Sequence, residues 1–452
     1  MNSSIQSRSA SLALSCAALL VLTACGGGGD DTSAASSAPL AAAADEGAAS
    51  ARALASNSAG AIVLVSSNTA GAARGGITGA LEGSTCGLSV DGSVVVFDSA
   101  SNSLVAGDTN NRSDTYVKNT RTGVTTRVSS GSEGSSCAAI TPDGKLVLFR
   151  TGYDSTSALF VKNLVNGSVT KVTPAVNSIA ENTGFIGGAI SDDGNKVLFR
   201  TIPTQNYVGQ YSYVNRVPSR LMIRDLRDNS LVTVATDDGV VAHGEVVYGG
   251  AISPDGNKVA FIADSVLVPG DTNGQPDVYV RDLVSGTTTL ASSTSAGVPA
   301  VITYCCNAQY GNPRFVNNNM VQFLAAQPSN LGPRADYLKN LANGQTSLLL
   351  ADVDGSTATV SGDGNKMAFS RIVLGGNFTY RAMLRDLRTG AEQVVSTTRT
   401  GVIGNGSVPT VQISRDGNSV AFTSNATNLV SPATPGNNTF QVYLKTVAAS
   451  PL

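Results

Sequence analysis

The chain has 452 residues, of which 42% are hydrophobic and only 14% are charged, and its formal net charge at pH 7 is -2. That charged fraction lies well below the quarter or so that is usual for globular proteins. The composition predicts no nucleic-acid partner, because there is no basic stripe to displace counterions from phosphates. We expect a surface rich in Ser, Thr, Asn and Gly, which suits an extracytoplasmic protein.

Residues 1–25 have the pattern of a secretory signal. Arg8 precedes an apolar run at residues 12–22, which is too short for a permanent transmembrane helix. The run ends in Leu-Thr-Ala-Cys at residues 22–25, which resembles the lipobox of bacterial lipoproteins. The resemblance implies that Cys25 is lipidated and becomes the new N-terminus. The alternative is an ordinary signal peptide with an incidental cysteine.

Residues 26–58 consist almost wholly of Ala, Ser, Gly and Asp. Such a segment has little apolar surface to bury, so we expect a flexible tether between a membrane and the folded domain. The lipoprotein resemblance places the protein in the bacterial cell envelope. The same resemblance implies sorting to the outer membrane, because Gly26 has no acidic residue close behind it.

A repeated stretch organises the rest of the chain. Its clearest copy, residues 251–261, reads Ala-Ile-Ser-Pro-Asp-Gly-Asn-Lys-Val-Ala-Phe. Asp-Gly between two apolar runs predicts a tight hairpin, because both residues tolerate positive φ angles. One copy is degenerate and has Asn317-Asn318 in place of Asp-Gly. The seven copies lie at residues 88–97, 140–149, 190–199, 251–261, 315–323, 360–369 and 413–422.

Each repeat continues into a second hairpin signal, Asp/Asn-Leu-x-x-Gly, as at residues 282–286 and 386–390. The Asp-Gly pairs at positions 91, 143, 193 and 255 are 52, 50 and 62 residues apart. Four antiparallel strands in a repeat of about 50 residues indicate a β-propeller blade. The sequence therefore predicts an all-β, seven-bladed propeller over residues 59–447. A series of β-sandwich domains would not explain one strand order repeated seven times.

The last repeat lacks a fourth strand, since only seven residues follow Lys445. Residues 60–67 resemble the fourth strand of an earlier repeat, at residues 390–397. We therefore expect residues 62–66 to pair with residues 441–445 and close the last blade, which removes an exposed sheet edge.

The cysteines other than Cys25 that follow the signal number four. Cys86 and Cys137 precede the first strands of neighbouring repeats in similar contexts, which predicts a disulfide between blades. Cys305 and Cys306 would then form a vicinal pair or stay reduced. The spacing and the single histidine argue against a metal site built on cysteine and histidine.

Two loops carry oxygen side chains at the spacing of calcium-binding loops. The same residues also make good turns, so calcium is one of two interpretations, and no other cofactor is expected. The proposed ligands are Asp271, Asn273 and Asp277 in one loop and Asp108, Asn110 and Asp114 in the other.

The repeat is interrupted by long connections in repeats three to five. Tyrosines on loops of a rigid scaffold are typical of recognition surfaces, although the insertions could also pack on one another as a plug. The candidate ligand-face residues are Tyr207, Tyr211, Tyr213, His243, Tyr248, Tyr304 and Tyr310.

The sequence gives little sign of catalysis. His243 is the only histidine, no Gly-x-Ser-x-Gly motif occurs, and tryptophan is missing. No catalytic residue is assigned, although a cluster of carboxylates in the central channel is not ruled out by sequence.

The run Ile-Ser-Pro-Asp-Gly and the later Gly-Asp-Thr-Asn-Gly-x-x-Asp-Val-Tyr-Val-Arg-Asp-Leu resemble the TolB-like branch of WD-type β-propeller repeats, over residues 60–446. The resemblance implies a non-enzymatic, monomeric module that binds an envelope protein, a peptide or a glycan. The alternative is a propeller-type hydrolase or lyase that acts on a polysaccharide or peptide through channel carboxylates.

Overall fold

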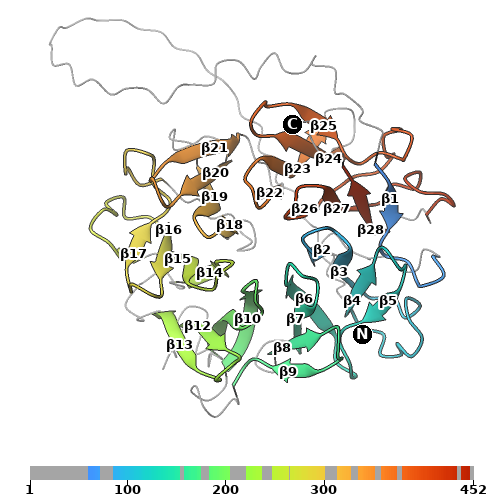
Figure 1. Ribbon diagram of the computed structural model, residues 1–452, viewed down its shortest axis with the longest axis horizontal. Helices are drawn as coiled ribbons and strands as arrows, with labels where there is room; N and C mark the ends of the chain where they lie inside the picture. The colour runs from blue at the N-terminus through green and yellow to red at the C-terminus, as the bar shows by residue number, and fades with distance from the viewer. Residues whose placement is uncertain are drawn as a thin grey trace, which may run out of the picture. The chain divides into compact units, whose positions relative to one another are not determined.

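The computed structural model describes residues 60–71, 85–152, 157–174, 183–203, 220–236, 247–263, 265–300, 313–326, 334–351, 358–373, 379–434 and 439–447. These residues form seven four-stranded antiparallel sheets arranged around a central axis (Figure 1). The prediction of an all-β, seven-bladed propeller is confirmed. The expected signal and tether, with Cys25, lie outside the described residues. No helix in the described ranges is long and apolar enough to cross a membrane.

Each blade is numbered in chain order, and its strands run from inner strand a to outer strand d. Blade 1 contains β2 (Thr85–Leu88), β3 (Val94–Ser99), β4 (Asp114–Asn119) and β5 (Thr125–Arg127). Blade 2 contains β6 (Ser135–Ile140), β7 (Leu146–Thr151), β8 (Ala158–Asn163) and β9 (Val169–Lys171). Blade 3 contains β10 (Thr183–Ile190), β11 (Lys196–Pro203), β12 (Arg220–Asp225) and β13 (Leu231–Thr236).

Blade 4 contains β14 (Val247–Ile252), β15 (Lys258–Ala263), β16 (Asp277–Asp282) and β17 (Thr288–Leu290). Blade 5 contains β18 (Arg314–Asn317), β19 (Met320–Ala326), β20 (Arg334–Asn340) and β21 (Thr346–Leu350). Blade 6 contains β22 (Ala358–Val360), β23 (Lys366–Val373), β24 (Thr379–Asp386) and β25 (Glu392–Val394). Blade 7 contains β26 (Val411–Ile413), β27 (Ser419–Ser424), β28 (Gln441–Thr446) and, as its outer strand, β1 (Ile62–Leu64).

Strand β1 closes the last blade in the predicted register. Ile62 lies opposite Lys445, and Leu64 lies opposite Tyr443. In Figure 1 the blue β1 lies beside the red β28. Beyond the strand, the Val65 N–H donates to the Val442 carbonyl oxygen at 2.8 Å. The first described residues therefore complete the sheet formed by the last ones.

The segment after β1 also binds the first blade. Lys118 Nζ on β4 donates to Ser67 Oγ at 3.0 Å and to the carbonyl oxygens of Ser67 and Asn68 at 3.3 and 3.2 Å. Lys118 is buried, so these contacts replace the water that its charge would otherwise need. The closing segment thus joins blade 7 to blade 1.

The Ser-x-Asp-Gly motif forms the turn between strands a and b as predicted. In blade 4, Ser253 Oγ accepts the Lys258 N–H at 2.9 Å, and Asp255 Oδ1 accepts the Asn257 N–H at 3.0 Å. Gly256 has a φ of +69°, which a residue with a Cβ atom rarely adopts. A Cβ atom there would also lie 3.0 Å from Cδ of Lys196 in the preceding blade. The motif therefore serves both the hairpin and the packing between blades.

A phenylalanine on strand b anchors the core of each blade. All seven are at most 3% exposed, and each lies opposite an aromatic residue or a methionine on strand c. The aromatic pairs have ring centroids 5.6 to 6.1 Å apart. Burial of each phenylalanine contributes about 2 to 3 kcal/mol. The phenylalanines are Phe97, Phe149, Phe199, Phe261, Phe323, Phe369 and Phe422.

Candidate functional site

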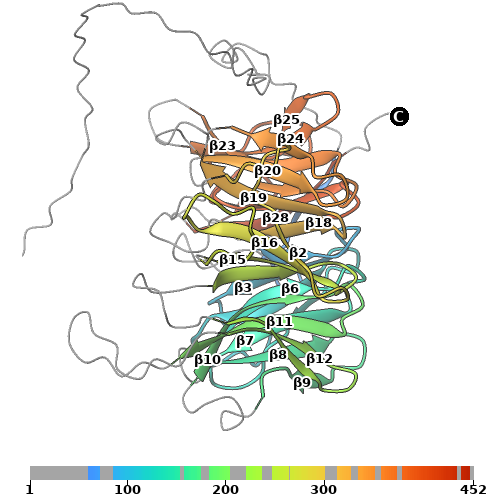
Figure 2. The ribbon, with the colours of Figure 1, turned by 90° about the vertical axis from the view of Figure 1, so that its left-hand side faces the viewer.

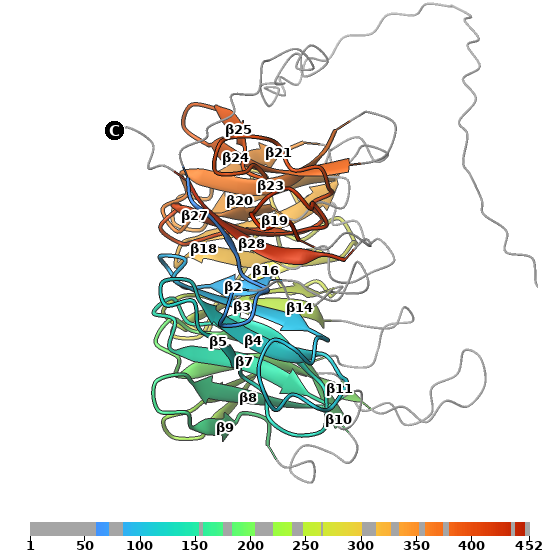
Figure 3. The same ribbon diagram turned by 90° about the vertical axis from the view of Figure 1, so that its right-hand side faces the viewer.

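The strand order gives the propeller two different faces. In an antiparallel sheet the a–b and c–d hairpins lie at one end, and the b–c and d–a connections lie at the other. Figures 2 and 3 show the propeller from two sides, at right angles to the view of Figure 1. Figure 1 shows the a strands nearest the axis, so the a–b turns surround the axis at the hairpin face.

Hydrogen bonds join neighbouring blades at these turns. Four backbone N–H groups donate to backbone carbonyl oxygens in a neighbouring blade. The donor and acceptor residues are Val90 and Pro142 (2.7 Å), Asp192 and Pro254 (2.8 Å), Gly362 and Arg415 (2.9 Å), and Asp416 and Val90 (3.1 Å). The Asp255 N–H donates to Asn318 Oδ1 (3.0 Å), and Asn317 Nδ2 donates to the Gly362 carbonyl oxygen (3.4 Å). Among the described residues, six of the seven boundaries between blades are bridged in this way. We call this set of contacts the turn ring.

An ion pair connects blades that are not neighbours. Arg415, at the a–b turn of blade 7, pairs with Asp192, at the a–b turn of blade 3. The two side chains are 30% and 39% exposed, so the pair is partly screened by water. Gly362 leaves room for it, because a Cβ atom there would lie 2.5 Å from Cγ of Arg415. The turn ring thus surrounds the axis at the hairpin face, and the Asp192–Arg415 pair connects two of its blades that are not neighbours.

The predicted ligand face is formed by the b–c and d–a connections, at the other end of the blades. Tyr248 lies on β14, but nothing is described of its side chain. The other candidates lie outside the described residues: Tyr207, Tyr211, Tyr213, His243, Tyr304 and Tyr310.

The acidic loop of blade 1 brings its two aspartates together around a guanidinium group. Arg127 Nη1 lies 3.6 Å from Asp108 Oδ1, and Arg127 Nη2 lies 2.8 Å from Asp114 Oδ2. Asn110 Nδ2 also donates to Asp114 Oδ2 at 2.9 Å. Asn110 Oδ1 accepts the Arg112 N–H at 3.0 Å, so it stabilises the turn. In this blade the two carboxylates have an internal cation as their partner.

The loop of blade 4 has the same two carboxylates without the arginine. Asp271 and Asp277 are both at least 95% buried. Burial raises the pKa of Asp277 most, hydrogen bonds with Ser292 and Asn273 lower it, and the negative charge of Asp271 raises it, which together give a pKa of about 7. Asn273 Oδ1 accepts the Gln275 N–H at 2.8 Å, and its amide nitrogen donates to the Ala300 carbonyl oxygen at 3.2 Å. The asparagine thus supports the loop in both blades.

Two further buried carboxyl groups link strands within blades and across their boundaries. Asp98 Oδ1 accepts the Thr115 hydroxyl at 2.9 Å and the Cys137 N–H of blade 2 at 3.0 Å. Asp336 Oδ2 accepts Nε2 of Gln322 at 2.6 Å, and Gln322 also donates to the Ala358 carbonyl oxygen of blade 6. Burial raises the pKa of each carboxyl to about 7. They lie on blades 1 and 5 and do not form one cluster.

The structure places Cys86 and Cys137 as a disulfide pair between blades 1 and 2, with Cα atoms 5.8 Å apart. A carboxylate oxygen of Asp98 lies within 4.8 Å of both sulfur atoms. Because the sulfurs are joined to each other, they offer no thiolate to a metal ion. Cys305 and Cys306 lie outside the described residues.

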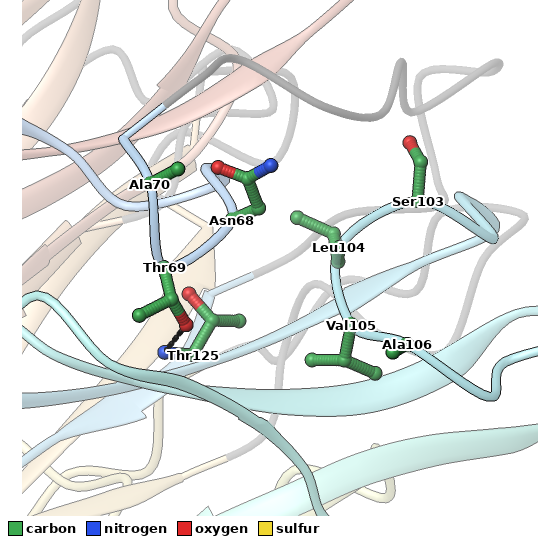
Figure 4. Close-up of a pocket in the computed structure, with 8 residues that line it drawn as sticks. All are labelled: Asn68, Thr69, Ala70, Ser103, Leu104, Val105, Ala106 and Thr125. Carbon is green, nitrogen blue, oxygen red and sulfur yellow. Dashed lines mark hydrogen bonds between the residues drawn. The ribbon is translucent and has the colours of Figure 1, made fainter.

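A shallow hollow of about 370 Å³ lies where the closing segment meets blade 1 (Figure 4). It is lined by residues 68–70, residues 103–106 and Thr125. The Thr125 N–H donates to Thr69 Oγ1 at 3.3 Å along one wall. The lining has no charged side chain and none of the predicted site residues, so we assign it to the closure of the propeller.

Sequence reasoning missed the turn ring, Arg127 and the linking roles of Asp98 and Asp336. The turn ring depends on how neighbouring blades pack, which no single repeat reveals. The sequence could have pointed to Arg127, because Arg127 and Leu290 are at equivalent positions of two repeats. Arg127 lies opposite Tyr116 in blade 1, and Leu290 lies opposite Tyr279 in blade 4. An alignment of the two strand c–d hairpins would have shown this exchange.

Neither a protein-family model nor a curated protein sequence matches the chain. Among solved structures, an oligogalacturonate lyase in complex with manganese is similar at 14% identity and a TM-score of 0.54, over 80% of this chain and 88% of that chain. The oligogalacturonate lyase of Vibrio parahaemolyticus gives 11% identity and a TM-score of 0.53, over 87% and 92%. TolB from Acinetobacter baumannii also matches, at 12% identity and a TM-score of 0.39, over 78% and 80%. The likeness to the two lyases supports the propeller fold, and at such identities it carries no activity over to this chain.

Proposed function

We propose that this protein is a lipid-anchored, extracytoplasmic β-propeller that binds a protein, peptide or glycan of the bacterial cell envelope without catalysing a reaction. Its ligand face is the end of the blades that bears the b–c and d–a connections. In this proposal Cys25 carries the lipid, the outer membrane is the site of anchoring, and the protein is a monomer.

The turn ring is the observation that carries this proposal. Bonds across six blade boundaries and the Asp192–Arg415 pair occupy the hairpin face around the axis. The hairpin face is thus occupied by contacts within the propeller, and we place the ligand at the opposite face. A rigid scaffold with variable loops at one end is a common arrangement for recognition.

The competing proposal is a hydrolase or lyase, and one observation favours it. Asp98 and Asp336 have pKa values near 7, in the range that suits general acid–base catalysis. Asp98 bonds across a blade boundary to Cys137, and Asp336 holds Gln322, which bonds across another boundary to Ala358, so each has a structural reason to be buried. They also lie on separate blades, so we favour binding.

The test compares three forms of the full chain on a glycan array and against detergent-extracted envelope proteins. One carries Tyr207→Ala, Tyr211→Ala and Tyr213→Ala together. The matched control carries Val165→Ser and Val284→Ser, at two exposed c–d turns of the hairpin face. We expect a ligand retained by the parent and the control and bound at least about tenfold more weakly by the tyrosine variant.

Equal retention by all three forms would contradict the assignment of the ligand face. A separate assay follows the cleavage of polygalacturonate and of peptides by the parent, Asp98→Asn and Asp336→Asn forms. Cleavage by the parent that is lost in a folded variant would replace binding with catalysis.

A further inference from the structure

Blades 1 and 4 contain the same arrangement of two buried aspartates. Tyr116 Oη donates to Asp108 Oδ2 in blade 1, and Tyr279 Oη donates to Asp271 Oδ2 in blade 4. Ser129 Oγ donates to Asp114 Oδ1, and Ser292 Oγ donates to Asp277 Oδ1. Both tyrosine hydroxyls also lie within hydrogen-bond distance of a main-chain carbonyl oxygen, that of Ser101 or Ser265. One carboxylate oxygen of each aspartate is therefore used in the same way in both blades.

The two remaining oxygens differ between the blades. In blade 1, the Arg127 guanidinium lies beside Asp108 Oδ1 and Asp114 Oδ2. In blade 4, the register puts Leu290 where blade 1 has Arg127. Among the described residues, Asp271 Oδ1 has no hydrogen-bond partner, and Asp277 Oδ2 has at most a weak contact with the Asn273 side chain. Within the described ranges, no positively charged side chain pairs with these two oxygens as Arg127 pairs with their counterparts in blade 1.

This difference creates an electrostatic problem in blade 4. Asp271 is 5% exposed and Asp277 is fully buried. Buried carboxylates without a partner are costly, and two that lie together repel each other. Leucine offers no charge and no hydrogen-bond donor, so Leu290 does not replace the Arg127 guanidinium.

We propose that blade 4 binds a calcium-class divalent cation between Asp271 Oδ1 and Asp277 Oδ2, at the position that the Arg127 guanidinium holds in blade 1. Hard divalent cations bind carboxylate oxygens and complete their coordination with carbonyl oxygens and water. The favoured ion is calcium, because it accepts irregular coordination. Asn273 Oδ1 already accepts the Gln275 N–H in the turn, so the loop does not offer a regular set of side-chain ligands. The site stands whether or not the loop face binds an envelope ligand.

Isothermal titration calorimetry and thermal unfolding of the chelator-treated full chain test the proposal. We expect the parent to bind one calcium ion and to melt roughly 3 to 5 °C higher at calcium 100-fold above its dissociation constant. Leu290→Arg should abolish both effects, because it supplies the guanidinium group of blade 1. Leu290→Met, the matched control, should behave like the parent.

The reverse exchange should create a second site. The Arg127→Leu variant should bind two calcium ions per chain instead of one. Its melting temperature should lie below that of the parent without calcium and close to it with calcium. Magnesium should raise the melting temperature less than calcium does. A parent that binds no calcium, or a folded Leu290→Arg variant that binds as the parent does, would overturn the proposal. An equal effect of magnesium would overturn the assignment to calcium.

Discussion

Asp98 shows how one side chain can join two blades at an energetic cost. It accepts hydrogen bonds from Thr115 in its own blade and from the Cys137 N–H in the next. Burial raises its pKa most, those two hydrogen bonds lower it, the Asp114 charge raises it, and Arg150 lowers it. The result is a pKa of about 7, so the folded protein holds a proton that the unfolded chain releases near pH 4.

The sign of the pH dependence follows from that difference. Between pH 4 and pH 7 the folded state binds more protons than the unfolded state, so the free energy of unfolding falls as the pH rises. Asp98→Asn removes this fall in the free energy of unfolding, because asparagine does not titrate. The asparagine amide oxygen can still accept both hydrogen bonds. We expect the variant to be more stable than the parent at pH 8, by up to about 4 kcal/mol, and nearly equal to it at pH 4. Urea unfolding at both pH values measures the difference.

Asp91 provides a control of the opposite sign. Partial burial raises its pKa, but hydrogen bonds from Ser93 and Ser89 and the charge of Arg121 together lower it to about 2. Its contribution to stability is therefore present above about pH 4 and is lost as the pH falls toward 2. Asp91→Asn should destabilise the protein at pH 8. A parent and an Asp98→Asn variant with parallel pH profiles would show that Asp98 does not titrate as described.

At the scale of the element, the disulfide connects strand β2 of blade 1 to strand β6 of blade 2. It joins residues 51 positions apart, so it restricts a long loop in the unfolded chain. We expect Cys86→Ser with Cys137→Ser to lower the free energy of unfolding by about 4 kcal/mol in the chain-entropy description. Denaturant unfolding measures the loss, and the single Cys86→Ser variant should show most of it.

Reduction supplies the matched control for this prediction. Dithiothreitol should destabilise the parent and leave the double serine variant unchanged. A parent that unfolds at the same urea concentration with and without reductant would contradict a stabilising bridge between blades.

The elements themselves could largely be predicted, because each hairpin is specified locally. Ser253, Asp255 and Gly256 form a turn whose contacts lie within a few residues, and even the degenerate Asn317-Asn318 copy forms its hairpin. Of the contacts between blades, only the Cys86–Cys137 disulfide could be predicted, because the two cysteines precede equivalent strands of neighbouring repeats. The reach of Asp98 to Cys137 in the next blade, and of Arg127 to Asp108 and Asp114 within blade 1, depends on sheet register and twist, which a single repeat does not encode.

At the scale of the whole molecule, the propeller depends on its closing segment. The pairing of β1 with β28, the Val65 N–H bond to Val442 and the Lys118 bonds to Ser67 and Asn68 join the two ends of the ring. With β1 added, the last blade has four strands like the other blades, and the edge of β28 is covered.

Thermal unfolding of two shortened chains therefore tests the central claim most directly. One begins at Gly60 and keeps β1, whereas the other begins at Asn68 and lacks it. We expect the second to lose roughly 5 kcal/mol or more, since it gives up the burial of Val65 and several hydrogen bonds, and to melt well below the first. Equal melting temperatures would contradict closure of the seventh blade by the N-terminal strand.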